Sequence, residues 1–276
     1  MIDTSMPTLT RQPVLYVTHG GGPCFWMSFP EPFGPHAYDR LKAYFTGLLA
    51  GLPARPRAIL VVSAHWEEPE VTVSTHPNPP MLYDYYGFPP HTYQLQYPAP
   101  GSAELGKHTR ELLQAAGITT RVDEQRGFDH GVFVPMLIID PQAQIPVVML
   151  SMHGDLDPAH HVAIGRALAP LRDEGVLIIG SGSSFHNLRT IFNGSDGASA
   201  EFDNWLHETV VESDGKTRNR RLLLWDKAPG ARAAHPREDH LIPLMVAAGA
   251  AADDVGRASF RDLIAGKAYS CFSFGA

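Results

Sequence analysis

Residues 158–187, PAHHVAIGRALAPLRDEGVLIIGSGSSFHN, place a helix-like segment, a glycine and an apolar run in immediate succession. We predict a helix over Pro158–Glu174 that ends at Gly175, because glycine is common just past a helix C-terminus. The apolar run Val176–Ser181 predicts a strand that is buried on both faces. A helix that leads directly into a buried strand is typical of α/β proteins with a largely parallel sheet.

The rest of the chain repeats this alternation. Further strands are predicted at Val14–Thr18, Ala58–Ala64, Val71–Thr75, Ile118–Val122, Ile145–Met152 and Lys267–Phe274. Further helices are predicted at Tyr38–Gly51, Ser102–Ala116, Val132–Ile139, Ala200–Asp214, Thr217–Asp226 and His240–Ala250, and a loop at Gly194–Ala200. We therefore expect an α/β fold: a single domain over residues 1–276, with a central mixed, largely parallel sheet flanked by helices.

The amino-acid composition argues against several classes of protein. The chain has 276 residues, of which 44% are hydrophobic and 18% charged, so it can form a sizeable core. A net charge of −7 without a basic run argues against a nucleic-acid partner. No signal-peptide pattern and no long apolar run is present, so we expect no membrane segment. Two cysteines are too few for a disulfide framework, and we expect a cytoplasmic protein.

Histidines follow three of the predicted strands. The chain has 14 histidines, and His19, His65 and His186 each come shortly after an apolar run ends. Ligands of open α/β sheets bind beyond the carboxyl ends of the strands, so we expect these side chains to share one site. Imidazoles that converge without cysteine suit zinc, iron or copper. His153 also follows a strand and could lie beside this site.

Two polar clusters could complete the site. One is Gly127–Gly131, Gly-Phe-Asp-His-Gly, which contains His130. The other is His-Pro-Arg-Glu-Asp-His at residues 235–240. We expect His240 in the first turn of a helix, from where it could project into the site. Asp239 could instead supply the carboxylate of a two-histidine, one-carboxylate iron site, or it could cap the helix.

Glycine-rich and aromatic stretches suggest other roles. Gly20–Gly22 follows a strand but lacks the Gly-x-Gly-x-x-Gly order of a dinucleotide site. The Gly-Ser-Gly-Ser-Ser run at 180–184 does not match the Gly-x-Ser-x-Gly turn of serine hydrolases. Long loops rich in aromatic residues are more often lids or binding loops than connectors. We expect Trp26 and Tyr83–Phe88 to form an apolar pocket wall.

Six motifs together resemble one family. They are Thr-His-Gly-Gly-Gly-Pro at 18–23, Ser-Ala-His-Trp-Glu at 63–67, Tyr-Pro-Ala-Pro-Gly-Ser at 97–102, Gly-Phe-Asp-His-Gly at 127–131, His-Asn-Leu-Arg at 186–189 and Pro-Arg-Glu-Asp-His-Leu-Ile-Pro-Leu at 236–244. In this order the chain resembles the class III extradiol ring-cleavage dioxygenases, in their DOPA-dioxygenase-like branch. The resemblance implies one α/β domain with one non-haem metal, normally Fe(II), although Zn also occurs.

The resemblance assigns roles residue by residue. His19 and His65 match the two metal-binding histidines of the family, and His240 matches the histidine of its Pro-x-x-Glu-His helix start. His186 matches a histidine that acts beside the metal, either as a ligand or as an acid/base. His130 matches a histidine that faces the substrate. We thus expect His19, His65, His186 and His240 to bind metal, and His130 and His186 to act in catalysis.

The expected activity is extradiol cleavage of a catechol. Such an enzyme uses Fe(II) to insert both atoms of O2 into the ring, which opens next to the hydroxyl pair. Its partners would be a small aromatic diol and O2. Two alternatives stay open at this point: a zinc-dependent hydrolase built on the same site, and a non-enzymatic, peptide-binding protein of the same fold.

Overall fold

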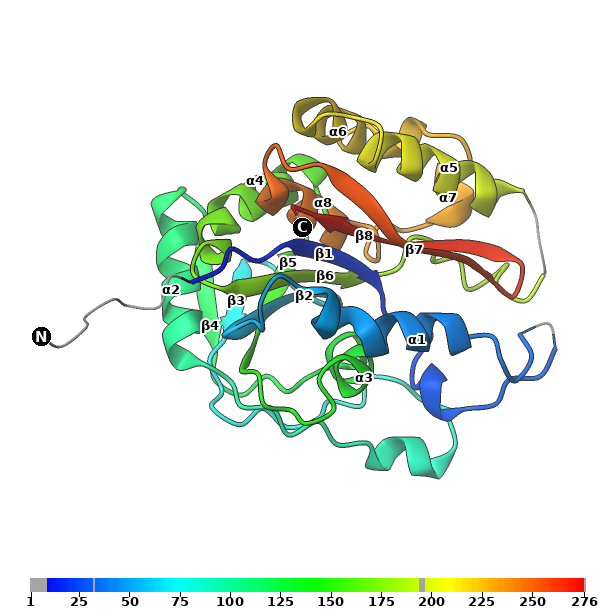
Figure 1. Ribbon diagram of the computed structural model, residues 1–276, viewed down its shortest axis with the longest axis horizontal. Helices are drawn as coiled ribbons and strands as arrows, with labels where there is room; N and C mark the ends of the chain where they lie inside the picture. Colours follow the sequence, from blue (N-terminus) through cyan, green and yellow to red (C-terminus); the bar gives the residue numbers. More distant parts are fainter. Residues whose placement is uncertain (1–8, 32, 194–196, 276) are drawn as a thin grey trace, which may run out of the picture.

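A computed structural model describes residues 9–31, 33–193 and 197–275. Within these residues, eight strands form one sheet in the order β4-β3-β5-β2-β6-β1-β8-β7 (Figure 1). The strands are β1 Val14–Thr18, β2 Ala58–Glu68, β3 Val71–Ser74, β4 Thr120–Asp123, β5 Val147–His153, β6 Val176–Gly182, β7 Gly256–Ile264 and β8 Lys267–Phe274. The central strands β5, β2, β6 and β1 are parallel, whereas β3 and β8 run antiparallel to their central neighbours. The predicted mixed, largely parallel sheet is confirmed.

Helices cover both faces of this sheet. They are α1 Asp39–Leu48, α2 Ala103–Ala115, α3 His130–Ile139, α4 Pro158–Leu168, α5 Ala198–Val210, α6 Gly215–Leu222, α7 Ala231–Ala234 and α8 Ile242–Ala251. Short 3-10 helices lie at η1 Cys24–Trp26, η2 Leu49–Gly51, η3 Pro90–Gln94, η4 Ala169–Arg172 and η5 Trp225–Lys227. In Figure 1, α1 and α3 lie below the sheet, and α4 and α8 lie above it.

Strand β6 shows how closely these layers approach. Ser181 donates a hydrogen bond to the carbonyl of Gly131 in α3, on one face of the sheet. Its neighbours Gly180 and Gly182 face the opposite side of the sheet, because successive residues of a strand face alternate sides. A Cβ on Gly182 would lie only 2.1 Å from the carbonyl oxygen of His240. The absence of a side chain there lets the turn before α8 rest directly on the strand.

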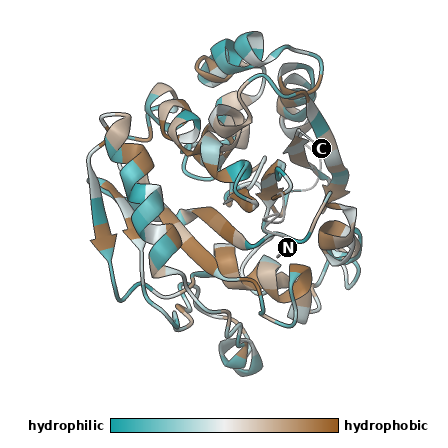
Figure 2. Ribbon diagram, turned by 60° about the vertical axis from the view of Figure 1, so that its left-hand side comes forward, coloured by the Kyte–Doolittle hydropathy of each residue, from teal (hydrophilic) through white to brown (hydrophobic). Residues whose placement is uncertain are grey.

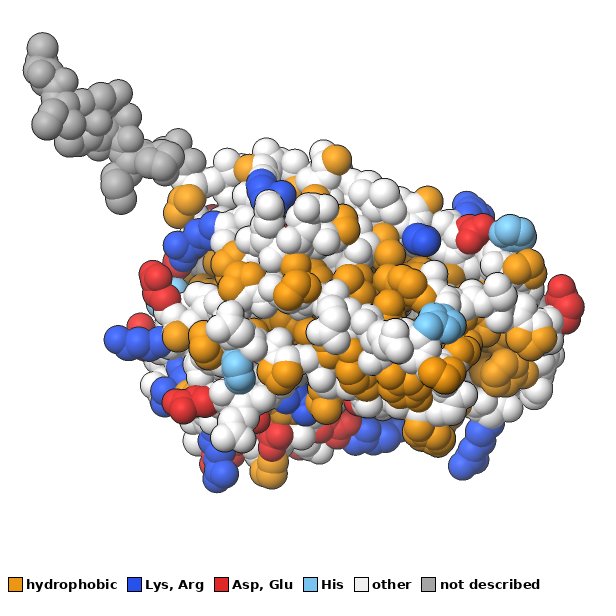
Figure 3. All heavy atoms as spheres, turned by 90° about the horizontal axis from the view of Figure 1, so that it is seen from below, with side chains coloured by type: hydrophobic (Ala, Val, Ile, Leu, Met, Phe, Trp, Pro, Cys, Tyr) orange, Lys and Arg blue, Asp and Glu red, His pale blue; other side chains and the backbone are white. Residues whose placement is uncertain are grey.

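The hydrophobic core is formed largely by the sheet and by α8. Figure 2 shows the strands as mostly hydrophobic, with hydrophilic faces on the outer helices. All ten residues of α8 are buried, and two buried arginines from other segments satisfy carbonyls at its C-terminal end. Arg218 donates to Ala248, and Arg172 donates to Ala250. Hydrophobic side chains also form a band on the surface seen from below, the side of α1 and α3 (Figure 3).

Several boundaries differ from those predicted. The helix predicted to start at His240 begins at Ile242, because the backbone first forms a turn in which the N–H groups of Leu241 and Ile242 share the carbonyl of Glu238. The helix predicted to end at Glu174 becomes a 3-10 turn after Leu168. Of the loop predicted at Gly194–Ala200, residues 194–196 lie outside the described residues, and α5 already begins at Ala198.

Strand β7 is a further difference, because no predicted strand corresponds to it. Of its residues, only Gly256, Phe260 and Ile264 are buried, so it lacks the continuous buried apolar run of the central strands. It joins β8 through Ala265 and Gly266, which both have positive φ. Ala-Gly is a weaker turn signal than the usual Asn-Gly.

No helix of the described residues combines the length and the apolar character that a membrane crossing requires.

Candidate functional site

A cavity of about 440 Å³ opens at the carboxyl ends of the central strands. The five histidines predicted to share a site all line it: His19, His65, His130, His186 and His240. They come from separate parts of the chain, and the parallel strands bring them together. The remaining walls are mainly aromatic and aliphatic.

His19 is the first residue after β1, and 1% of its surface is exposed. Its Nδ1 lies 3.0 Å from the hydroxyl oxygen of Ser181. Because Ser181 donates its only hydroxyl proton to the carbonyl of Gly131, it must accept a proton from Nδ1 of His19. The Nε2 atom of His19 therefore has a free lone pair, which is the state that binds a metal.

His65 lies inside β2, since this strand continues past the predicted end at Ala64 to Glu68. The pairing of β2 with β5 shifts register between Val62 and Glu67, and such an irregularity can redirect a side chain. Here the Nε2 atoms of His65 and His19 lie 3.1 Å apart.

His240 is held by both its ring and its backbone. Its Nδ1–H donates to Asp239 over 2.8 Å, which leaves Nε2 free. Its carbonyl oxygen accepts hydrogen bonds from the hydroxyl of Tyr16 at 2.9 Å and from the backbone N–H of Ser183 at 3.0 Å. These contacts fix the ring relative to β1 and β6.

His130 begins α3 and is held by Asp84. The backbone N–H and Nδ1 of His130 lie 2.9 and 2.8 Å from the same carboxylate oxygen of Asp84. The second oxygen of Asp84 is 3.6 Å from Nδ1 of His65. Burial acts to raise the pKa of Asp84, but hydrogen bonds and charge from His130 outweigh it and lower that pKa below its usual value. Asp84 is thus a charged partner of two site histidines.

His186 approaches from the loop after β6. Its ring stacks on that of His240, with centroids 3.4 Å apart and planes inclined by 17°. Its Nδ1 lies 4.0 Å from Asp239, and its side chain is 26% exposed, more than those of the neighbouring histidines. It is therefore more accessible from the cavity.

Burial favours the neutral form of four of these imidazoles. Desolvation, reinforced by the neighbouring histidines, lowers the pKa values of His19 and His240 well below the ordinary value. It lowers the pKa of His65 to about 3, and it also lowers that of His186. Neutral imidazole is the form that donates a lone pair to a metal ion.

The donor atoms are close enough to share one ion. One nitrogen from each of His19, His65 and His240 lies within 4.8 Å of the others. Two imidazole nitrogens bound to one ion at roughly 2.0–2.1 Å lie about 3.0–3.4 Å apart, so the 3.1 Å between His19 and His65 fits a common metal. His186, Asp239 and His240 form an overlapping group of possible ligands.

The structure corrects two predictions about the surroundings. His153 ends β5 but does not line the cavity, because its ring faces Asp155 and His160 in a separate cluster. Trp26 and Tyr83 also lie outside the wall, whereas Tyr85, Tyr86 and Phe88 belong to it. The ring of Trp26 packs against that of Phe25, and the ring of Tyr83 packs against that of Tyr85.

Sequence reasoning missed the residues that hold the site histidines. Asp84 lies in an aromatic loop, where the only sequence signal is a single acidic residue between tyrosines. Ser181 was predicted as the end of a strand, without a role at the site. His235 is fully buried and bonds through Nε2 to the carbonyl of Ser184, so it supports the same region without lining the cavity.

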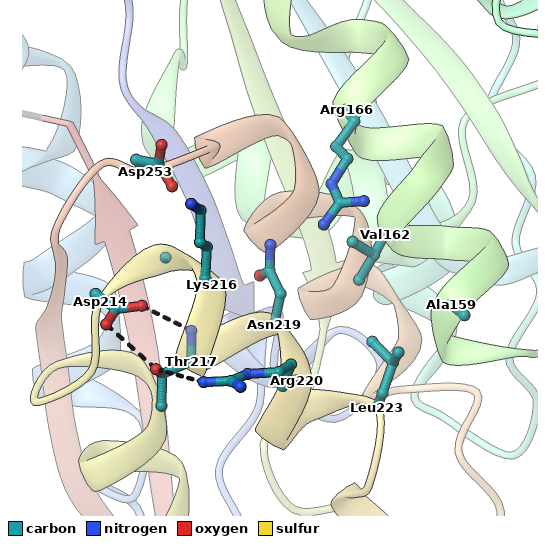
Figure 4. Close-up of a pocket in the computed structure, with 11 residues that line it drawn as sticks. Ala159, Val162, Arg166, Asp214, Lys216, Thr217, Asn219, Arg220, Leu223 and Asp253 are labelled. Carbon is teal, nitrogen blue, oxygen red and sulfur yellow. Dashed lines mark hydrogen bonds between the residues drawn. The ribbon is translucent and has the colours of Figure 1, made fainter.

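A larger cavity, of about 690 Å³, lies elsewhere, between α4 and α6. Figure 4 shows Arg166, Lys216 and Asn219 directed toward the space between these helices. The carboxylates of Asp214 and Asp253 also line it, but no histidine or cysteine among the described residues does. Its size alone does not identify the site of chemistry, and the histidine cavity is the better candidate.

Neutral histidines grouped beside an aromatic cavity form a candidate metal-binding site suited to an aromatic compound. The family model of the catalytic LigB subunit of aromatic ring-opening dioxygenase matches residues 41–270. The chain belongs to this family and is an extradiol dioxygenase. His19 precedes the matched range, and the fold brings it to the other histidines.

Relatives agree with this assignment. A Beta vulgaris protein named 4,5-DOPA dioxygenase extradiol is 43% identical over 204 residues, which cover 72% of this chain and 75% of the relative. An Escherichia coli protein of the same name is 34% identical over 245 residues, which cover 87% of this chain and 86% of the relative. The crystal structure of an uncharacterized Escherichia coli K12 protein matches with a TM-score of 0.75 and 29% identity, covering 96% of this chain and all of that one.

Proposed function

We propose that this protein is an Fe(II)-dependent extradiol dioxygenase that uses both atoms of O2 to open a catechol ring next to its hydroxyl pair. The observation that carries the proposal is the group of imidazole nitrogens from His19, His65 and His240 at the cavity. Zn²⁺ could fill the same donor set. Two free, buried cysteines, Cys24 and Cys271, are compatible with the cytoplasmic location that we also propose.

His19, His65 and His240 would hold the metal. A bound Fe(II) would supply coordination sites for the two catechol oxygens and O2, and would lower the pKa of the bound phenol. Asp239 is better placed as the partner of His240 than as a ligand, because its Oδ2 accepts the Nδ1–H of that ring. Such an outer carboxylate fixes the ring and makes its free nitrogen a stronger donor.

His130 would take the remaining phenolic proton. Its Nδ1–H is committed to Asp84, so the lone pair on Nε2 is the one available as a base. Asp84 stabilises the imidazolium that forms when the proton arrives. The ring of Tyr85 packs edge-on against His130, with centroids 5.8 Å apart, and covers one side of this imidazole.

His186 has two possible roles at this site. Its ring stacks on that of His240, and its side chain is more exposed than those of His65, His130 and His240, which suits an acid/base that exchanges protons at the cavity. Its nitrogen also belongs to a group of possible ligands with Asp239 and His240. We assign it acid/base catalysis. Metal ligation is the competing role, and the iron content of His186→Ala distinguishes the two.

The decisive experiment is reconstitution with Fe(II) without oxygen, followed by addition of O2 and a panel of catechols. We expect O2 uptake together with a yellow ring-opened product. His65→Ala should lose most of the bound iron, measured by elemental analysis, because it removes one of three neighbouring nitrogens. His36→Ala is the matched control, since that side chain is 83% exposed and pairs with Asp39.

Other results would contradict the proposal. Unchanged iron content in His65→Ala would exclude this donor set. Hydrolytic activity that survives iron removal and depends on Zn²⁺ would favour a zinc hydrolase. Failure of every catechol to react, in protein loaded with iron, would favour a non-enzymatic binding protein.

A further inference from the structure

The outer part of the histidine cavity is built without charge. Of the described residues that line it, none is Lys, Arg, Asp or Glu. The two carboxylates nearest to the histidines, Asp84 and Asp239, do not line it and are bonded to His130 and His240. Arg189, in the loop that follows β6, does not line it either. As far as the described residues go, the lining therefore holds no fixed charge to pair with a charged substituent.

Three hydroxyl groups of this wall already donate hydrogen bonds to the protein. Tyr85 donates its hydroxyl proton to the carbonyl of Thr92 over 2.6 Å. Thr18 donates to the carbonyl of Ser270 over 3.0 Å, and Ser183 donates to that of Phe185 over 2.7 Å. These hydroxyls have no second proton to offer to a carboxylate. A carboxylate or ammonium here would meet no oppositely charged side chain among the described residues of the wall, so it would lose hydration without gaining an ion pair.

The mouth of the cavity is apolar and exposed. Tyr86, Leu188 and Phe192 line it, with 91%, 65% and 64% of their surfaces accessible. Phe192 packs on Phe33, whose ring lies 5.3 Å away, so the mouth continues the aromatic wall outward. Large apolar side chains grouped on a surface commonly mark a binding site. A substrate substituent that covers these side chains gains binding free energy, because it removes their apolar surface from water.

We propose that the substrate is a catechol with an uncharged, apolar substituent that extends from the histidines to this mouth. The inference rests on the proposed function for the catechol itself, and on the wall chemistry for the substituent. It sets this chain apart from relatives named for DOPA, whose side chain bears an ammonium and a carboxylate.

The test compares catechols that differ only in the substituent at the 4-position. Ethyl-, propyl- and butylcatechol are set against 3-(3,4-dihydroxyphenyl)propionate, dopamine and L-DOPA, with the iron-loaded enzyme. We expect kcat/KM to rise about three- to fourfold with each added methylene that the wall covers. The charged compounds should fall at least tenfold below the neutral ones. Calorimetric binding under nitrogen, without turnover, should give the same order.

A double variant tests the mouth itself. Leu188→Ser with Phe192→Ser should lower the kcat/KM ratio of butylcatechol to catechol at least fivefold. Leu224→Ser is the matched control, because Leu224 is 61% exposed but lies outside the cavity, and the ratio should not change.

L-DOPA or the propionate binding as tightly as butylcatechol would overturn the inference, as would an unchanged ratio in the double variant. If no catechol reacts at all, the proposed function fails, and the calorimetric order alone still decides the substituent preference.

Discussion

Single protons decide which nitrogen of each histidine can bind a metal. The hydroxyl of Ser181 fixes the proton of His19 on Nδ1, and the carboxylate of Asp239 does the same for His240. Both rings therefore present Nε2 to the cavity. Because these histidines follow strands of one sheet, the sequence predicts that they converge. It does not indicate that Ser181, which is distant in the chain, orients His19. Asp84 is the clearest example of a site residue that the sequence does not predict, because nothing near it in the sequence marks it as a partner of His130.

His186→Ala separates the two roles left for His186. If this ring is an acid/base, the variant should keep its iron and lose roughly 10²–10⁴-fold in kcat. Elemental analysis and steady-state O2 uptake on the same sample give both quantities. His186→Gln serves as the companion variant, because it keeps most of the volume stacked on His240. Loss of iron in both variants would instead make His186 a ligand.

At the level of elements, the contact between β6 and the turn before α8 positions His240. A Cβ on Gly182 would lie 2.1 Å from the carbonyl of His240, and one on Gly180 would lie 2.3 Å from that of Pro243. The sequence predicts the strand and the helix, because both have clear apolar patterns. It does not predict that the helix starts after His240, because that start depends on how the turn packs against β6.

Gly182→Ala should therefore weaken the metal site without touching a ligand. The new methyl group must push the turn away from β6, and we expect iron affinity to fall about 10–100-fold, the range seen when groups that support a ligand are removed. Competition with a chelator measures the affinity. Gly47→Ala in α1 is the control, since a Cβ there meets nothing within 4 Å. Equal affinities in the two variants would argue against this positioning role.

For the whole molecule, buried histidines make stability depend on pH. His161 is buried outside the cavity, and burial is the main cause that lowers its pKa to about 4. Its Nε2 accepts a hydrogen bond from the backbone N–H of His153, which requires the neutral ring. In the unfolded chain a histidine has a pKa of about 6.5. Below that pH the unfolded chain binds a proton that the folded protein does not, so acid favours unfolding.

The metal-free protein should lose stability as the pH falls from about 6.5 toward 4, with His161 alone contributing up to about 3 kcal/mol. Urea unfolding at pH 7 and at pH 4.5 measures the free energies. His161→Gln should be destabilised at pH 7, and its difference from the wild type should shrink at pH 4.5. The exposed His36→Gln should follow the wild type at both values. Parallel pH profiles of wild type and His161→Gln would contradict this linkage.

Sequence patterns predict the central parallel strands because those strands are continuous apolar runs. They fail at the edge of the sheet, where β7 is half exposed and depends on pairing with β8. The same distinction holds for the cavity. Its histidines follow a topological rule, whereas its walls depend on packing between loops that no local pattern specifies.

The sheet order also determines when the protein can fold during its synthesis. Strand β1 leaves the ribosome first, yet its partners are β6 and β8, so Val14 pairs with Ile178 and Phe274. A long stretch of chain must therefore be translated before this apolar strand finds either neighbour, and delayed pairing of this kind leaves nascent chains open to aggregation. A product terminated before His240 would lack the last imidazole of the cluster. The proposed metal site can thus be completed only after most of the chain has been translated.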